Sequence, residues 1–188
     1  MVVAQYEQTT TWYPTEATVL ESTRPGGWDT PTEPLPAPLA LHRTVVPDSW
    51  VDYNGHMSEW CYLLAMGDNS DAFFRFIGID EGYRASGFSL YTVETHIRNL
   101  DEAGLGDDVH STLRVLGVDA KRVHIAHEVW SDDRLLATGE QMLLHVDMAA
   151  GRTAPLPDVL HARLTALADA HGILPLPDWV GRRIALPA

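Results

Sequence analysis

Residues 58–77 read SEWCYLLAMGDNSDAFFRFI, and this stretch decides the fold. Its polar side chains Asp68, Asp71 and Arg75 stand at i, i+3 and i+7, so they form one narrow stripe along a helix. Most other positions are apolar, and a helix that is apolar around most of its circumference is buried. Gly78 follows at once and is a favoured residue for ending a helix. The stretch therefore predicts one long helix in the core of the protein.

Strand-like segments lie on both sides of this helix in the sequence. One precedes it at residues 39–46, and the others follow with short turns between them, at residues 89–101, 107–118, 122–131 and 135–147. Asp132-Asp133 predicts a tight hairpin turn between the last two segments. One strand, one buried helix and then a run of antiparallel strands predict an α+β fold, in which an antiparallel sheet wraps around a long central helix.

The two ends of the chain differ from this central part. Residues 1–38 are rich in threonine and carry five prolines from position 25 onward, a composition that resists helices and sheet interiors. We expect an extended or disordered N-terminal arm over residues 1–38 and the main domain over residues 39–150. Residues 151–188 are expected to form a C-terminal helix and a tail that pack on the domain.

The composition excludes several classes of function. The formal net charge is −13, from 26 acidic and 13 basic side chains, so the surface repels nucleic-acid backbones. No apolar run is long enough to span a membrane, and the N-terminus has no signal-peptide pattern. Cys61 is the only cysteine, which favours a reducing, cytoplasmic location. We interpret Cys61 as a buried apolar residue, with a nucleophile as the alternative.

The sequence predicts neither a metal site nor a cofactor. The nine histidines include no His-x-x-x-His pair and no carboxylate–histidine group with the spacing of metal ligands. Neither a glycine-rich phosphate loop nor a Gly-x-Ser-x-Gly nucleophile elbow occurs in the sequence.

Polar residues gather directly before the predicted helix, in the segment 52–57, which reads DYNGHM. A helix N-terminus offers unpaired backbone N–H groups and the positive end of the helix dipole, which suit an oxygen that gains negative charge. Gly55 allows a close approach of the backbone, and Asp52 would stand beside it as a general base or a nucleophile. The alternative is an Asx-turn that leads into the helix, for which Asp and Asn are common choices.

A second polar segment lies on the strand predicted over residues 89–101. With a period of two, one face carries Thr92, Glu94, His96 and Arg98. The other face should contact the central helix and carries Tyr91, Val93, Thr95 and Ile97. The polar face is either exposed to solvent or lines a cleft in which Glu94 pairs with His96 or Arg98, and the periodicity leaves both open.

These two segments resemble a known family. Residues 47–57, PDSWVDYNGHM, and residues 91–103, YTVETHIRNLDEA, resemble the hotdog-fold thioesterases of the 4-hydroxybenzoyl-CoA thioesterase type. The Asp-x-x-Gly-His pattern is fairly specific for that superfamily. The region from about 40 to 185 looks most like betainyl-CoA thioesterase, a domain known alone and fused behind L-carnitine dehydrogenase. Residues 91–98 and the late VGRRI at 180–184 carry this closer likeness.

The resemblance implies a hotdog fold and a homodimer, or a tetramer of such dimers, with two sheets joined edge to edge and two active sites at the interface. It implies that Asp52 is the general base or nucleophile. The amides near Gly55 and His56, with Asn54 in the same turn, would bind the thioester oxygen. Glu94 would reach the same cleft, so the choice between Asp52 and Glu94 as the principal carboxylate stays open.

The implied substrate is a small acyl-CoA, with betainyl-CoA hydrolysed to betaine and CoA in carnitine catabolism. Aromatic faces near a carboxylate bind a trimethylammonium group, and the candidates, some of which must be core residues, are Trp50, Tyr53, Trp60, Tyr62, Phe88 and Tyr91. Thr92 and His96 would line the cleft, and Arg98, Lys121 and Arg122 are candidates for CoA phosphates. The alternatives are another short or aromatic acyl-CoA, a hotdog hydratase, and a module that binds acyl-CoA without turnover.

Overall fold

The computed structural model describes residues 35–186, so the arm predicted over residues 1–38 lies almost entirely outside the described residues. In chain order the elements are β1 (Leu39–Val45), η1 (Asp48–Trp50), α1 (Glu59–Ile77), α2 (Glu81–Ala85), β2 (Phe88–Asn99), β3 (Asp108–Val118), β4 (Arg122–Ser131), β5 (Arg134–Asp147), β6 (Arg152–Thr153) and α3 (Asp158–His171).

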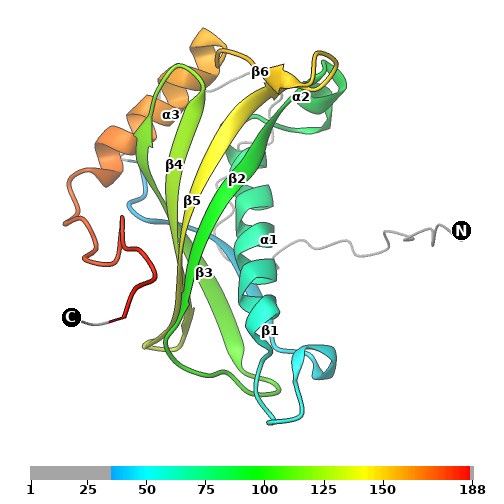
Figure 1. The fold of residues 1–188 in the computed structure, drawn as a ribbon, viewed down its shortest axis with the longest axis vertical. Helices are drawn as coiled ribbons and strands as arrows, with labels where there is room; N and C mark the ends of the chain where they lie inside the picture. The colour runs from blue at the N-terminus through cyan, green and yellow to red at the C-terminus, as the bar shows by residue number, and fades with distance from the viewer. Residues whose placement is uncertain (1–34, 187–188) are drawn as a thin grey trace, which may run out of the picture.

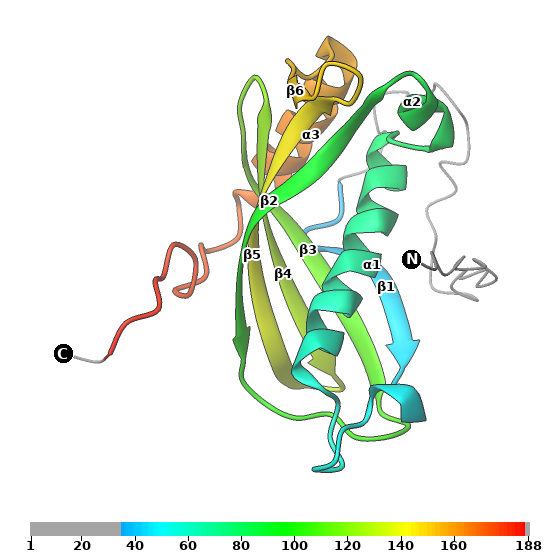
Figure 2. The ribbon, with the colours of Figure 1, turned by 45° about the vertical axis from the view of Figure 1, so that its right-hand side comes forward.

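The strands form one antiparallel sheet in the order β1-β3-β4-β5-β2, with β6 paired to the end of β5. The sheet curls around α1, and α3 lies along β3 at the other side of the molecule (Figures 1 and 2). The predicted α+β architecture, a sheet wrapped around a long helix, is confirmed. Within residues 35–186 β2 pairs only with β5, so its second edge is unpaired in this part of the chain.

The long helix begins at Glu59 and ends at Gly78, which adopts the left-handed conformation with φ 96°. One face of α1 packs on the sheet through Cys61, Met66 and Phe73, all fully buried. The packing is tight, since a Cβ atom on Gly139 of β5 would overlap the Met66 sulfur.

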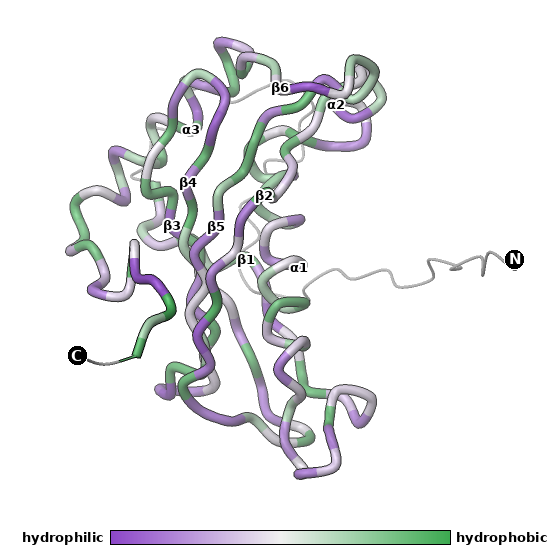
Figure 3. The backbone as a smooth tube through the Cα atoms, in the orientation of Figure 1, coloured by the Kyte–Doolittle hydropathy of each residue, from purple (hydrophilic) through white to green (hydrophobic). Residues whose placement is uncertain are grey.

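The opposite face of α1 is exposed, contrary to the prediction from its composition. Trp60 is 56% exposed, Leu63 45% and Leu64 38%, and together they form an exposed apolar stripe. Farther along the helix the exposed residues are the polar Asp68 and Asp71. Figure 3 shows the mixed hydropathy of the helix. Among the described residues the sheet covers one side of α1, so burial of the other side requires something outside residues 35–186.

The core has two parts along α1. The first surrounds the C-terminal half of the helix and includes Phe73, Ile77 and the α3 residues Leu164 and Leu167. The second surrounds the N-terminal half and includes Met57, Cys61, Tyr62, Met66 and Val109. The Cys61 side chain is completely buried, and burial raises the pKa of its thiol, which agrees with its interpretation as a small apolar residue rather than a nucleophile.

A polar group joins helix and sheet between these two parts. The Asn69 amide donates to His127 Nδ1 over 3.1 Å, so the opposite nitrogen, Nε2, carries the proton and faces Ser70 Oγ and Gln141 Oε1, each at 3.3 Å. All four side chains are buried. Burial lowers the pKa of His127 to about 4, and the hydrogen bond with Gln141 opposes the change only in part.

His127 should make the fold sensitive to mild acid. Its pKa in the folded protein lies below the value of about 6.5 expected in the unfolded chain, so the unfolded chain binds more protons between those pH values. Its contribution is complete above pH ~6.5 and is lost as the pH falls to ~4, which amounts to about 3 kcal/mol. Urea unfolding at pH 7 and pH 5 should show a smaller loss in His127→Gln than in the wild type. The same pH dependence in both proteins would contradict this role.

Candidate functional site

The polar segment before α1 is a tight turn closed by a bridge between Val51 and Met57. The Asp52 N–H donates to the His56 carbonyl over 2.9 Å, and the Gly55 N–H donates to the Asp52 carbonyl over 3.0 Å. Gly55 has φ 84°, a conformation that glycine adopts without strain. The glycine at position 55 therefore suits the backbone conformation that this turn requires.

Asp52 also forms the Asx-turn that the sequence offered as the alternative. Its Oδ1 accepts from the Asn54 N–H over 2.7 Å, whereas Oδ2 has only a 3.5 Å contact with the Asn54 amide. One carboxylate oxygen therefore holds the turn. The other remains accessible to a small molecule, since Asp52 is only half-buried.

Backbone amides near Asp52 lack partners in this part of the chain. The Ser58 side chain does not cap α1, and within residues 35–186 the amides of His56, Glu59 and Trp60 have no hydrogen-bond partner. The Gly55 amide, in contrast, is used within the turn. The donors available beside Asp52 are therefore the His56 amide and the first amides of α1, at the positive end of the helix dipole.

Tyr62 anchors the loop that follows β2. Its hydroxyl donates to the Asp101 carbonyl and accepts from the Ala103 N–H, both over 3.3 Å, and the Met57 N–H donates to the Ala103 carbonyl over 2.7 Å. The side chain is only 3% exposed, and burial raises the pKa of its phenol. Tyr62 therefore holds the site's framework rather than presenting an aromatic face. His56 lies beside this loop, with Nδ1 3.2 Å from a Glu102 oxygen.

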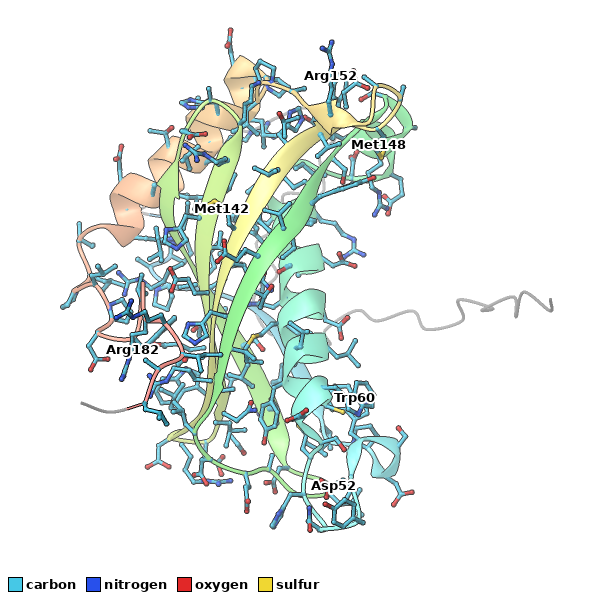
Figure 4. All side chains as sticks on the ribbon, viewed as in Figure 1. Asp52, Trp60, Met142, Met148, Arg152 and Arg182 are labelled. Carbon is cyan, nitrogen blue, oxygen red and sulfur yellow. The ribbon has the colours of Figure 1, made fainter. Side chains whose placement is uncertain are left out.

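The other aromatic candidates divide into two groups. Tyr53 and Trp60 are 96% and 56% exposed. Trp60 lies at the same end of the molecule as Asp52 (Figure 4). Trp50 packs against the part of the core that surrounds the N-terminal half of α1. Phe88 instead stacks on His145 with ring centroids 5.5 Å apart. It begins β2 at the far end of α1, so a single chain does not bring it to Asp52.

The predicted polar ladder on β2 is broken by a bulge at Val93. Thr92 pairs with Leu143, but Glu94 pairs with Met142, so one extra residue is inserted on β2. Cross-strand partners share a face, and Leu143 and Gln141 lie on the face that packs against α1. Thr92 therefore faces the helix side. Glu94, His96 and Arg98 lie on the outer face, away from α1. The prediction that Thr92, Glu94, His96 and Arg98 share one face of the strand was therefore wrong.

The bulge also separates the two candidate carboxylates. Asp52 lies in the turn before α1, while Glu94 pairs with Met142 on the outer face of β2, so the two carboxylates lie on different sides of the sheet within one chain. Tyr91 and Val93 are 48% and 54% exposed and do not pack on the helix. Ile97, in contrast, packs against the part of the core that surrounds the N-terminal half of α1.

One residue on the outer face was missed by the sequence analysis. Glu140, opposite His96, accepts from His124 Nε2 and from the Gly181 N–H, both over 2.7 Å. It thereby ties the tail to the sheet beside the buried Trp179. The VGRRI motif at 180–184 was a signal for this tail, but no pattern linked it to a glutamate some 40 residues earlier.

The candidate phosphate ligands Lys121 and Arg122 lie at the β6 end of the sheet. With Leu144 and Thr153 they line an open hollow of about 350 Å³. Arg122 Nε donates to Asp119 Oδ2 over 2.6 Å, which lowers the pKa of Asp119 to about 2. Within residues 35–186, no helix is long and apolar enough to cross a membrane, and no three potential metal ligands gather at one point.

A sheet curled around one long helix, with an acidic turn at the helix N-terminus, defines a hotdog-fold protein. The chain belongs to the thioesterase-like superfamily, which it matches over residues 46–164.

Three known proteins are similar to it over most of its length. Betainyl-CoA thioesterase of Pseudomonas aeruginosa is 44% identical over 152 residues, which cover 79% of this chain and 96% of that protein. The L-carnitine dehydrogenase/betainyl-CoA thioesterase of Rhizobium meliloti is 48% identical over 150 residues; the match covers 78% of this chain but only 30% of that longer protein. A Staphylococcus aureus protein solved in complex with CoA is 25% identical, with a TM-score of 0.71, over 81% of this chain and 99% of that one.

Proposed function

We propose that this protein hydrolyses betainyl-CoA to betaine and CoA, as a step of carnitine catabolism. The observation that carries the proposal is the Asp52 turn in front of an uncapped helix, in a chain of which 79% is similar to a betainyl-CoA thioesterase. The turn supplies a carboxylate and free amides within a few residues of one another, the two groups that acyl transfer from a thioester needs.

Asp52 acts as general base or as nucleophile. As a base, its carboxylate takes a proton from water, the water oxygen bonds to the thioester carbon, and the carbon–sulfur bond breaks. The CoA thiolate leaves with its electron pair and then takes up the proton. The carbonyl oxygen gains negative charge during the attack, and the amides of His56, Glu59 and Trp60 are placed to donate to it.

The acting unit is a homodimer formed through the edge of β2 that no other strand of residues 35–186 pairs with. This edge is twelve residues long, and its exposed run 91–95 is centred on Val93. A long unpaired edge is a ready template for another strand, and antiparallel pairing with a second copy gives a closed two-fold interface. Because α1 runs beside β2 (Figure 2), such pairing would also cover exposed apolar residues of this helix.

Antiparallel pairing also gives the phosphate candidates a role. It brings the β6 end of the second copy toward the Asp52 end of the first. Lys121 and Arg122 of one copy then lie on the side from which CoA approaches Asp52 of the other, and Glu94 reaches the site only from the second copy. Such local cations counteract the repulsion that a chain of net charge −13 exerts on CoA.

The test is free-thiol release from a panel of betainyl-CoA, acetyl-CoA, 4-hydroxybenzoyl-CoA and a medium-chain acyl-CoA. We expect kcat/KM for betainyl-CoA to exceed that for acetyl-CoA by at least about tenfold, since a cation held against aromatic faces contributes some 1–2 kcal/mol. A clear preference for another thioester would keep the thioesterase and reject betainyl-CoA. Binding of all four without thiol release would reject hydrolysis.

A further inference from the structure

The loop 100–107, between β2 and β3, joins the turn before α1 to the sheet. The Met57 N–H donates to the Ala103 carbonyl over 2.7 Å, so the loop holds the residue that closes the turn. Beside this bond, His56 Nδ1 lies 3.2 Å from a Glu102 oxygen. Figures 1 and 2 show the loop, the turn and the β4–β5 hairpin at one end of the molecule. The position of the loop therefore affects the position of the turn.

Arg134, the first residue of β5, holds this loop from the hairpin side. Its Nη1 donates to the Glu102 carbonyl over 2.9 Å and to Asp101 Oδ2 over 3.2 Å. Its Nη2 lies 3.6 Å from Asp107 Oδ2. One side chain thus contacts the loop on both sides of Ala103. Because a guanidinium presents its donors in a rigid planar fork, it can hold these acceptors at fixed positions.

The two ends of the loop have supports of their own. The Leu136 carbonyl of β5 accepts from the first two amides of the loop, and the Val46 carbonyl accepts from the Gly106 N–H over 2.9 Å. Between these ends, the loop is held by Tyr62 on the α1 side and by Arg134 on the β5 side. Loss of Arg134 should therefore leave the ends in place and release the middle, which is the part bound to the turn.

The charges of the loop give Arg134 a further role. Residues 100–107 contain three carboxylates and no basic side chain. The Glu102 N–H, and then the Arg134 guanidinium, hold the pKa of Asp101 below its usual value. An exposed ion pair of this kind contributes little to stability. The expected effect of Arg134 is therefore on where the loop lies and not on whether the protein folds.

We propose that Arg134 is a positioning residue for thioester hydrolysis. It holds the loop so that the turn before α1 presents Asp52 and the His56 amide in the geometry that attack on the thioester carbon requires. The proposal rests on the proposed function. Arg134 acts through Ala103 and Met57 and not by contact with the substrate. Reaction rates depend steeply on such geometry, since a displacement of about 1 Å can lower a rate by about a hundredfold.

The first test separates kcat from KM. Arg134→Gln should lower kcat for betainyl-CoA by about tenfold or more and leave KM within about twofold, because the attack is impaired and not the binding of CoA. Arg43→Gln is the matched control. Arg43 also pairs with an aspartate, with Nε donating to Asp108 Oδ1 over 2.6 Å, but this pair joins β1 to β3 one residue after the loop. The control should match the wild type in kcat and in KM.

A betainyl thioester of N-acetylcysteamine tests whether Arg134 binds CoA instead. This substrate keeps the acyl group and the thioester but carries no phosphate. If Arg134 positions the turn, Arg134→Gln lowers kcat/KM for the short thioester and for betainyl-CoA by the same factor. A loss confined to betainyl-CoA and seen in KM would mean that the guanidinium binds a CoA phosphate, and the proposal would be overturned.

Arg134→Lys covers the case in which Arg134→Gln does not fold. Lysine keeps the charge but lacks the planar fork, so its kcat should lie between those of the wild type and Arg134→Gln. Wild-type kinetics in both variants, or an equal fall of kcat in Arg43→Gln, would overturn only the role of Arg134. If the wild type prefers another thioester, betainyl-CoA is rejected and Arg134 is tested on that thioester. A wild type that releases no thiol from the whole panel overturns both proposals.

Discussion

Asp52→Asn is expected to lower kcat for thioester hydrolysis by about a hundredfold or more, the scale of losing a positioned acid–base group. Asparagine can neither take a proton from water nor attack the thioester carbon. It does keep a carbonyl oxygen where Asp52 Oδ1 accepts from the Asn54 N–H, so the turn before α1 should persist. The variant therefore separates the chemistry of the carboxylate from its structural role.

The measurement is single-turnover thiol release, with thermal unfolding recorded on the same samples. Asp48→Asn is a matched control, since it removes the same charge from an exposed position four residues earlier. We expect an unchanged unfolding temperature in both variants and slow turnover in Asp52→Asn alone. If Asp52→Asn turned over like the wild type, the chemistry would belong to another carboxylate, and Glu94→Gln would be the next variant.

The sequence predicted the fold well because its main signals are local. The helix over residues 58–77 differs by one residue from α1, and the predicted strands after it match β2 to β5 closely. The Asx-turn at Asp52 was anticipated as well, since an Asp two residues before an Asn is a short-range pattern. Each of these features depends on residues that are close in the chain.

What the sequence could not predict depends on pairing. Period-two alternation puts Thr92 with Glu94, but the bulge at Val93 is defined by the register against β5, which no pattern within β2 reveals. Similarly, the apolar composition of α1 predicted burial around all but one narrow polar stripe, yet Trp60 and Leu63 are exposed. Their composition is consistent with burial in an assembly rather than in one chain. No local sequence pattern showed that Phe88 lies far from Asp52, because that separation also depends on how the elements pair in space.

Val93→Glu is expected to abolish dimer formation and, with it, nearly all activity. Val93 lies at the centre of the exposed run of β2, so two-fold pairing through this run brings the two copies of Val93 close together, and one substitution introduces two neighbouring carboxylates. Like charges directly opposite each other destabilise a strand pair. Val159→Glu on α3 is the control, because Val159 is 65% exposed and its helix packs on β3 rather than on β2.

Sedimentation and thiol release on the same samples test this expectation. The Val93→Glu protein should sediment as a monomer and lose about a hundredfold in kcat/KM, because a monomer keeps Asp52 but lacks Glu94 and the cations of the second copy. Val159→Glu should match the wild type in both measurements. A monomeric Val93→Glu protein with full activity on betainyl-CoA would mean that one chain holds a complete site, and the second copy would then have no part in the reaction. A dimeric, inactive variant would mean instead that the copies associate through another surface and that Val93 itself contacts the substrate.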